Sequence, residues 1–231
     1  MQNKKSKVLV IALIVGLVAI LSVSSLAWFT AKDDVTNQFN LATNFSIDVY
    51  ETTEWGEIVK NEDGETIGQA YTNLMPGAVL HKDPTVVNDG GHDEYVRLKV
   101  TMTGYDAWSD AVKPGTDGKV HLETIFSEFN TDWVRFDNPE ISSDGKSVTY
   151  TFYLNKVLKP YADTGMTSTL FKGLTIPTSL TSEQAKTMSS TFDIKIEGEA
   201  IQTENMGTGV TSKATVAERA YEAFALLTPS T

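Results

Sequence analysis

The chain has 231 residues and no cysteine, so no disulfide can hold its fold together and no thiol nucleophile is present. Its stability must therefore come from a packed core. No Pro- or Gly-rich linker divides the sequence, and this continuity favours one domain over two. The chain also lacks a Gly-x-Ser-x-Gly motif and a Gly-rich phosphate loop, which removes two common signatures of enzymes.

Basic residues are scarce, because 19 Lys and Arg stand against 30 Asp and Glu, for a formal net charge of −11 at pH 7. Three of the basic residues are Lys4, Lys5 and Lys7, so the chain beyond them has a net charge of −14. Nucleic acids and anionic lipid surfaces need clustered Lys and Arg, so neither is expected as a partner. The charge balance suits an extracellular protein.

The N-terminus has the features of a secretory signal. The three lysines precede an apolar run from Val8 to Leu26, and small residues at Ser25 and Ala27 end it. Cleavage between Ala27 and Trp28 would make residues 1–27 a signal peptide, helical before cleavage, and leave 204 residues. The alternative is an uncleaved membrane anchor, since the run is almost long enough to span a bilayer. Either way the bulk of the chain is exported and meets the membrane only through this segment.

Much of the remaining chain alternates between apolar and polar residues, which is typical of strands with one buried face. The pattern is clearest in residues 94–102, where Val96, Leu98, Val100 and Met102 share a face. Other strands are predicted at 35–49, 78–88, 133–136, 147–154, 169–176 and 192–201. Pro84 cannot donate to a ladder, so its strand is either at an edge or contains a bulge.

Turns and short helices complete the predicted fold. Turns are expected at 61–64 and 142–145, and short helical segments at 121–129 and 182–188. Residues 213–227 repeat apolar side chains at three- or four-residue spacing and predict an amphipathic helix packed on the strands. Many short strands with turns between them predict an all-β, jelly-roll-like antiparallel β-sandwich over residues 44–231, with a few short helices, one of them near the C-terminus.

Residues 28–43 form a separate segment between the signal and the sandwich. Its large apolar side chains are Trp28, Phe29, Val35, Phe39 and Leu41. Burying each of them stabilises by roughly 1.5–3 kcal/mol, enough for the segment to add as a donor strand to the sheet edge of another copy. The other interpretation is that the segment packs as the first strand of its own domain, and alternation alone favours this one because most alternating segments are intramolecular strands.

Three stretches share their order and spacing with a known family. They are Leu26-Ala-Trp-Phe-Thr-Ala31 with 37–41 and 45–49; Leu74-Met-Pro-Gly77 with 84–90; and Tyr95-Val-Arg-Leu-Lys-Val100 with, more loosely, 196–202. On these stretches the chain resembles the TasA/camelysin family of secreted bacterial matrix and fibre proteins, which are exported through a dedicated SipW-type signal peptidase.

The resemblance implies a jelly-roll-like sandwich and a pilus-like structural role in a surface fibre or biofilm matrix of a Gram-positive-type bacterium. In fibre-forming relatives the N-terminal segment of one subunit completes the sheet of the next. That role would fall on residues 28–41 here, so self-association is the expected partnership, besides the signal peptidase met during export.

Camelysin has been classed with metalloproteases, which makes a secreted metalloprotease one alternative. Hydrolytic zinc usually has three protein ligands, often from a His-Glu-x-x-His helix. The chain has only His81, His92 and His121, widely spaced and outside such a motif. The Asp-Gly steps in 61–65 and 116–118 offer oxygen ligands for calcium but are typical of ordinary turns. We therefore expect no catalytic residue, no metal ligand and no cofactor.

Three tryptophans suggest a second alternative. Trp55, Trp108 and Trp133 could line a carbohydrate groove, as in a monomeric secreted adhesin or an accessory matrix protein. Tryptophans of a β-sandwich are more often core residues, however. The sequence thus predicts a secreted, non-enzymatic structural protein. Polymerisation through its N-terminal segment and packing of that segment within its own chain both remain open.

Overall fold

A computed structural model describes residues 30–33, 46–68, 75–105, 108, 109, 112, 122–181, 183, 184 and 193–227. The predicted signal segment and its cleavage site lie outside the described residues, so the signal helix stays a prediction. The five apolar residues assigned to assembly also lie outside them: Trp28, Phe29, Val35, Phe39 and Leu41. Among the residues that the structure does describe, no helix is both long and apolar enough to cross a membrane.

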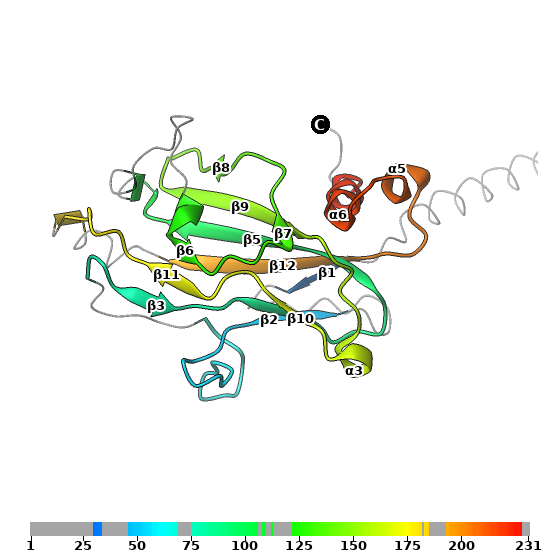
Figure 1. Cartoon of the computed structure of the whole chain (residues 1–231), viewed down its shortest axis with the longest axis horizontal. Coiled ribbons are helices and arrows are strands. Elements are labelled where there is room, and N and C mark those ends of the chain that lie inside the picture. Colours follow the sequence, from blue (N-terminus) through cyan, green and yellow to red (C-terminus); the bar gives the residue numbers. More distant parts are fainter. Residues whose placement is uncertain are drawn as a thin grey trace, which may run out of the picture.

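The larger sheet has six antiparallel strands in the order β1-β12-β5-β9-β7, with β8 also beside β9 (Figure 1). The strands are β1 (Thr30–Asp33), β12 (Ile194–Gln202), β5 (Glu94–Thr103), β9 (Ser147–Leu154), β7 (Trp133–Val134) and β8 (Glu140–Ile141). The alternation predicted for β5 is confirmed, because Val96, Leu98, Val100 and Met102 are fully buried. The intervening Arg97, Lys99 and Thr101 are partly exposed.

The second layer consists of two three-stranded sheets, β10-β4-β2 and β3-β11-β6. Their strands are β2 (Ile47–Tyr50), β3 (Val79–His81), β4 (Thr85–Asn88), β6 (Phe126–Ser127), β10 (Thr167–Thr169) and β11 (Gly173–Thr175). The two sheets are joined across their break, since the Leu170 backbone N–H donates to the Pro84 carbonyl at 2.9 Å. Pro84 therefore lies in an interruption between β3 and β4, where it need not donate to a ladder. β4 has a neighbour on each side, whereas β3 is an edge strand of its sheet.

The main core fills the space between the two layers. The rings of Phe126 and Phe171 stack there with their centroids 4.1 Å apart. Trp108 and Trp133 belong to the same core, with 0% and 3% of their surface exposed. The alternative of a surface groove lined by all three tryptophans is therefore wrong, because only Trp55 of the three is exposed. The expected class, an all-β antiparallel sandwich with a few short helices, is confirmed.

The helix predicted near the C-terminus is α6 (Val216–Ala225), and it packs on the outer face of β5, β9 and β12. Thr215 caps it in a capping box with Glu218, which satisfies two backbone donors. The Arg97 guanidinium lies 4.2 Å from the ring centroid of the buried Phe224. The other helices described are η1 (Leu122–Ile125), α3 (Tyr161–Thr164) and α5 (Thr208–Thr211). The prediction of a helix at 121–129 is therefore wrong for most of its length: only the 3-10 turn η1 forms there, and strand β6 follows it.

Candidate functional site

The described part of the predicted assembly segment is β1, which lies at one end of the larger sheet. It pairs antiparallel with β12, so that Ala31 lies opposite Ala200 and Asp33 opposite Gly198. β1 also contacts β2 of the second layer and therefore follows the seam between the layers (Figure 1). Pairing within one chain agrees with the intramolecular interpretation of this segment. It also identifies the backbone edge that such a strand uses.

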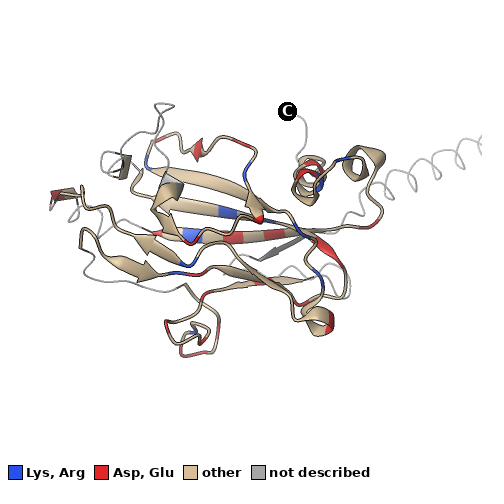
Figure 2. Cartoon of the chain, in the orientation of Figure 1, with Lys and Arg blue, Asp and Glu red and all other residues tan. Residues whose placement is uncertain are grey.

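Ion pairs from the neighbouring strand β5 hold β12, the strand that pairs with β1, in place. The carboxylate of Glu199 on β12 is buried and accepts from Arg97 at 2.5 Å and from Lys99 at 3.2 Å. Basic and acidic residues accordingly lie side by side on β5 and β12 (Figure 2). Charge-assisted bonds of this kind are strong and fix the strand geometry. The partner strand of β1 is thus preorganised by β5.

A close approach between the layers fixes the other side of the seam. Gly198 of β12 faces β2, and a Cβ atom built on it would lie 2.6 Å from Val49 Cγ2 and 3.1 Å from Ile47 Cδ1. Real side-chain contacts are not this short, so only glycine allows the present spacing. β2 and β12 therefore meet where β1 adds to the sheet.

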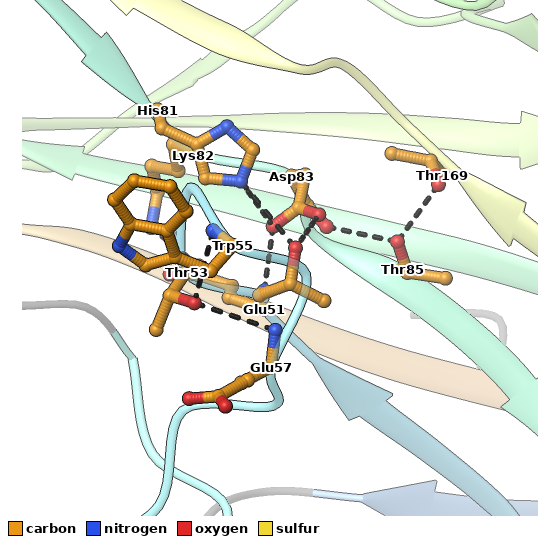
Figure 3. Close-up of polar contacts among 10 residues, drawn as sticks. Glu51, Thr53, Trp55, Glu57, His81, Lys82, Asp83, Thr85 and Thr169 are labelled. Atoms are coloured by element: carbon orange, nitrogen blue, oxygen red, sulfur yellow. Dashed lines mark hydrogen bonds and ion pairs between the residues drawn. The ribbon is translucent and has the colours of Figure 1, made fainter.

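A polar network joins the loop after β2 to the break between β3 and β4 (Figure 3). The Thr52 backbone N–H donates to Asp83 Oδ1 at 2.7 Å, and its hydroxyl donates to Asp83 Oδ2 at 2.5 Å. His81 Nε2 lies 3.4 Å from the Thr52 hydroxyl and 3.5 Å from Asp83 Oδ1. A hydrolytic triad would need the carboxylate on the other ring nitrogen and the hydroxyl proton directed at the histidine. This network instead fastens the loop to the second layer.

The loop fastened in this way, residues 51–68, carries Trp55 at a turn and leaves 87% of its surface exposed. Single bridges pair Thr52 with Ile58 and Lys60 with Thr66. The turn predicted at 61–64 is confirmed, because the Gly64 backbone N–H donates to the Asn61 carbonyl at 3.0 Å. The Asn61 side-chain oxygen accepts from two backbone N–H groups, which is typical of an ordinary turn.

The histidines do not assemble a zinc site in the part of the chain that the structure covers. His81 belongs to β3, whereas His92 is exposed in the loop before β5; His121 lies outside the described residues. Within the described ranges, no group of three or more His, Asp or Glu side chains could hold a metal ion. The structure therefore does not bring together the three ligands that hydrolytic zinc usually needs.

Sequence reasoning missed Glu94, the first residue of β5, whose side chain is 0% exposed. Neither carboxyl oxygen has a hydrogen-bond partner. Burial, with a smaller contribution from the charge of Asp89, raises the pKa of this carboxyl to about 9. The alternation in the sequence did indicate that Glu94 is buried, because this residue stands two positions before Val96 on the apolar face of β5.

No family model, no characterised protein and no solved structure matches this chain. The TasA/camelysin resemblance therefore rests on the three sequence stretches alone.

Proposed function

We propose that the chain is a secreted structural protein of a bacterial surface fibre or biofilm matrix, similar to the TasA/camelysin family and with a jelly-roll-like topology. It polymerises when residues 28–43 of one copy pair with the β12 edge of the next. The observation that supports this most directly is the position of β1. This four-residue strand is the outermost strand of its sheet and belongs to the segment that follows the predicted signal cleavage site.

Exchange of β1 between copies preserves every contact that β1 makes within one copy. The same antiparallel pairing forms whether the strand comes from its own chain or from a neighbour, which is the basis of domain swapping. The interaction is strand addition to a sheet edge, where main-chain hydrogen bonds give affinity. Because each subunit offers one donor segment and one acceptor edge, the contact is head-to-tail and propagates into a filament.

A disulfide experiment distinguishes exchange from intramolecular pairing. Since the chain has no cysteine, the pair Ala31→Cys and Ala200→Cys places two thiols at opposed positions of β1 and β12. Under oxidising conditions we expect a ladder of linked subunits on a non-reducing gel. The control pair Thr101→Cys and Thr149→Cys joins β5 to β9 and gives monomers whatever the assembly state. A monomer band alone from the first pair would contradict exchange.

Electron microscopy tests the same proposal without new side chains. The protein starting at Trp28 is compared with a version starting at Asn44, which lacks the assembly segment. We expect fibres from the first and folded monomers from the second. Fibres from both would show that assembly uses another surface.

One observation favours a second function, that of a monomeric adhesin or accessory matrix protein. Trp55 presents its indole to solvent on a loop that the Thr52–Asp83 hydrogen bonds hold in place. Aromatic side chains fixed in this way are common anchors of binding surfaces. Binding of the monomer to a glycan or host surface, abolished by Trp55→Ala, would support this function over the fibre.

A further inference from the structure

The two faces of the β1–β12 pair have different neighbours. Ala200 of β12 is fully buried in the main core between the layers, whereas Ile201 is buried on the outer face, in the cluster that α6 covers. Residues directly opposite each other in an antiparallel pair share a face of the sheet. Position 31, opposite Ala200, is therefore on the core-facing side of β1, and position 30, opposite Ile201, is on the outer side.

The core-facing side of β12 is lined by small residues where β1 adds to it. These are Gly198 and Ala200, which lie opposite positions 33 and 31 of β1. Gly198 approaches β2 so closely that a Cβ atom on it would lie 2.6 Å from Val49 Cγ2. β1 contacts β2 as well, so the core-facing positions of β1 enter the same narrow seam. A large side chain at these positions would overpack the seam.

The sequence around β1 fits this seam in one register only. In an extended strand, the residues that share a face with Ala31 are Phe29, Asp33 and Val35. The observed register places the two shortest of these four side chains opposite Ala200 and Gly198. A slip of two residues in one direction would bring Phe29 opposite Ala200, and a slip in the other direction would bring Val35 opposite Gly198. A slip of one residue would exchange the two faces of the strand.

We infer that Ala31 is the specificity-determining residue of the donor strand: the β12 edge accepts the segment of a second copy because position 31 is small, and it excludes strands that bring a large side chain there. Selection of a second copy rests on the proposed function, whereas the register applies equally to pairing within one chain. Main-chain hydrogen bonds at a sheet edge accept almost any extended segment, so side chains must provide the selection. Exclusion by size is a repulsive element of the kind that specific interfaces use.

Disulfide mapping in the chain starting at Trp28, which contains every described residue, tests the register. Ala31→Cys with Ala200→Cys joins opposed positions, whereas Asp33→Cys with Ala200→Cys joins positions opposed only after a slip of two residues. Such diagonal positions are about 7–8 Å apart, beyond the usual reach of a disulfide. Mass spectrometry of digested protein should therefore find at least about tenfold more linkage in the first pair, within and between chains together. Equal linkage in the two pairs would overturn the single register. Linkage of the first pair within single chains only would overturn selection of a second copy, and the proposed function with it.

Ala31→Leu in the same chain tests exclusion by size. It should release β1, so that the amides of residues 30–33 exchange hydrogen at least about tenfold faster and fibres are lost. Ala31→Ser keeps the residue small and should behave like the wild type. Lys32→Leu is the matched control, because it places the same side chain on the outer side of β1, opposite Glu199, in place of a longer one. Unchanged amide exchange in Ala31→Leu, or an equal effect of Lys32→Leu, would overturn the role of Ala31. The amide measurement decides this even if the wild type forms no fibres, so it is independent of the proposed function.

Discussion

The ammonium group of Lys82 forms an ion pair with the carboxylate of Glu51 in the interior of the protein, where the two side chains are only 5% and 7% exposed. The two residues are 31 positions apart in the sequence. Glu51 directly follows β2, and Lys82 lies in the break between β3 and β4. The pair therefore links β2 to the interrupted part of the second layer, close to the seam that β1 follows.

Removing one partner of this pair should be strongly destabilising. Lys82→Met leaves the Glu51 carboxylate buried without its counter-charge, and we expect the free energy of unfolding to fall by about 3–5 kcal/mol. The double variant Lys82→Met, Glu51→Leu should recover most of this loss, because no charge then remains buried. Urea unfolding of the three proteins measures the effect.

The chain offers a matched control for this prediction. Lys156 pairs with Asp132 at the surface, where the two side chains are 58% and 35% exposed. Lys156→Met should therefore cost less than about 1 kcal/mol. Equal losses from Lys82→Met and Lys156→Met would show that burial does not govern the energetics of the first pair.

The contact between Gly198 and β2 predicts a second stability effect. Gly198→Ala introduces a methyl group 2.6 Å from Val49 Cγ2, so the Val49 side chain or the strand that carries it must shift. We expect a loss of about 1–3 kcal/mol in urea unfolding, the usual range for overpacking. Gly207→Ala is the control, since a Cβ atom there meets no other atom within 4 Å. If Gly198→Ala unfolds like the wild type, the layers are not closely packed at this point.

Local patterns in the sequence were sufficient to predict individual strands, turns and helices. The alternation in β5, the turn at 142–145 and the spacing of apolar residues in α6 each depend on neighbours within a few positions, and the structure confirms all three. The wrong helix prediction at 121–129 also has a local cause. A 3-10 turn and a two-residue strand are too short to show a clear periodicity of apolar residues.

The features of the candidate sites could not be predicted in this way. Pairing of β1 with β12 joins segments more than a hundred residues apart, and the Lys82–Glu51 pair depends on which loops meet across the second layer. Alternation gives the face of each strand but not its neighbour. Glu94 is the exception, since its place on the apolar face of β5 was readable from the sequence.

The buried Glu94 predicts an unusual dependence of stability on pH. Its pKa is about 9 in the folded protein and 4.5 in a solvated chain, so between these pH values the folded state keeps a proton that the unfolded state loses. The free energy of unfolding should therefore fall as pH rises, by up to about 1.4 kcal/mol for each pH unit, and the stabilisation is complete only below pH 4.5.

The difference between wild type and Glu94→Gln isolates this contribution from those of other groups. The variant should gain stability relative to the wild type from pH 5 to pH 9, because glutamine does not ionise in either state. Urea unfolding at a series of pH values measures the difference. A constant difference across the series would mean that Glu94 is ionised and solvated in the folded protein.

In the part of the chain that the structure describes, the contrast between Trp55 and the core tryptophans predicts which indole reports on the surface. Trp55 is 87% exposed, whereas Trp108 and Trp133 are buried, so Trp55→Ala should remove red-shifted fluorescence that acrylamide quenches readily. The free energy of unfolding should change by less than about 0.5 kcal/mol, because the substitution deletes few contacts. Trp133→Ala, by comparison, should cost about 3–5 kcal/mol. A large loss of stability from Trp55→Ala would mean that the indole packs against the protein, and would remove the main support for the adhesin function.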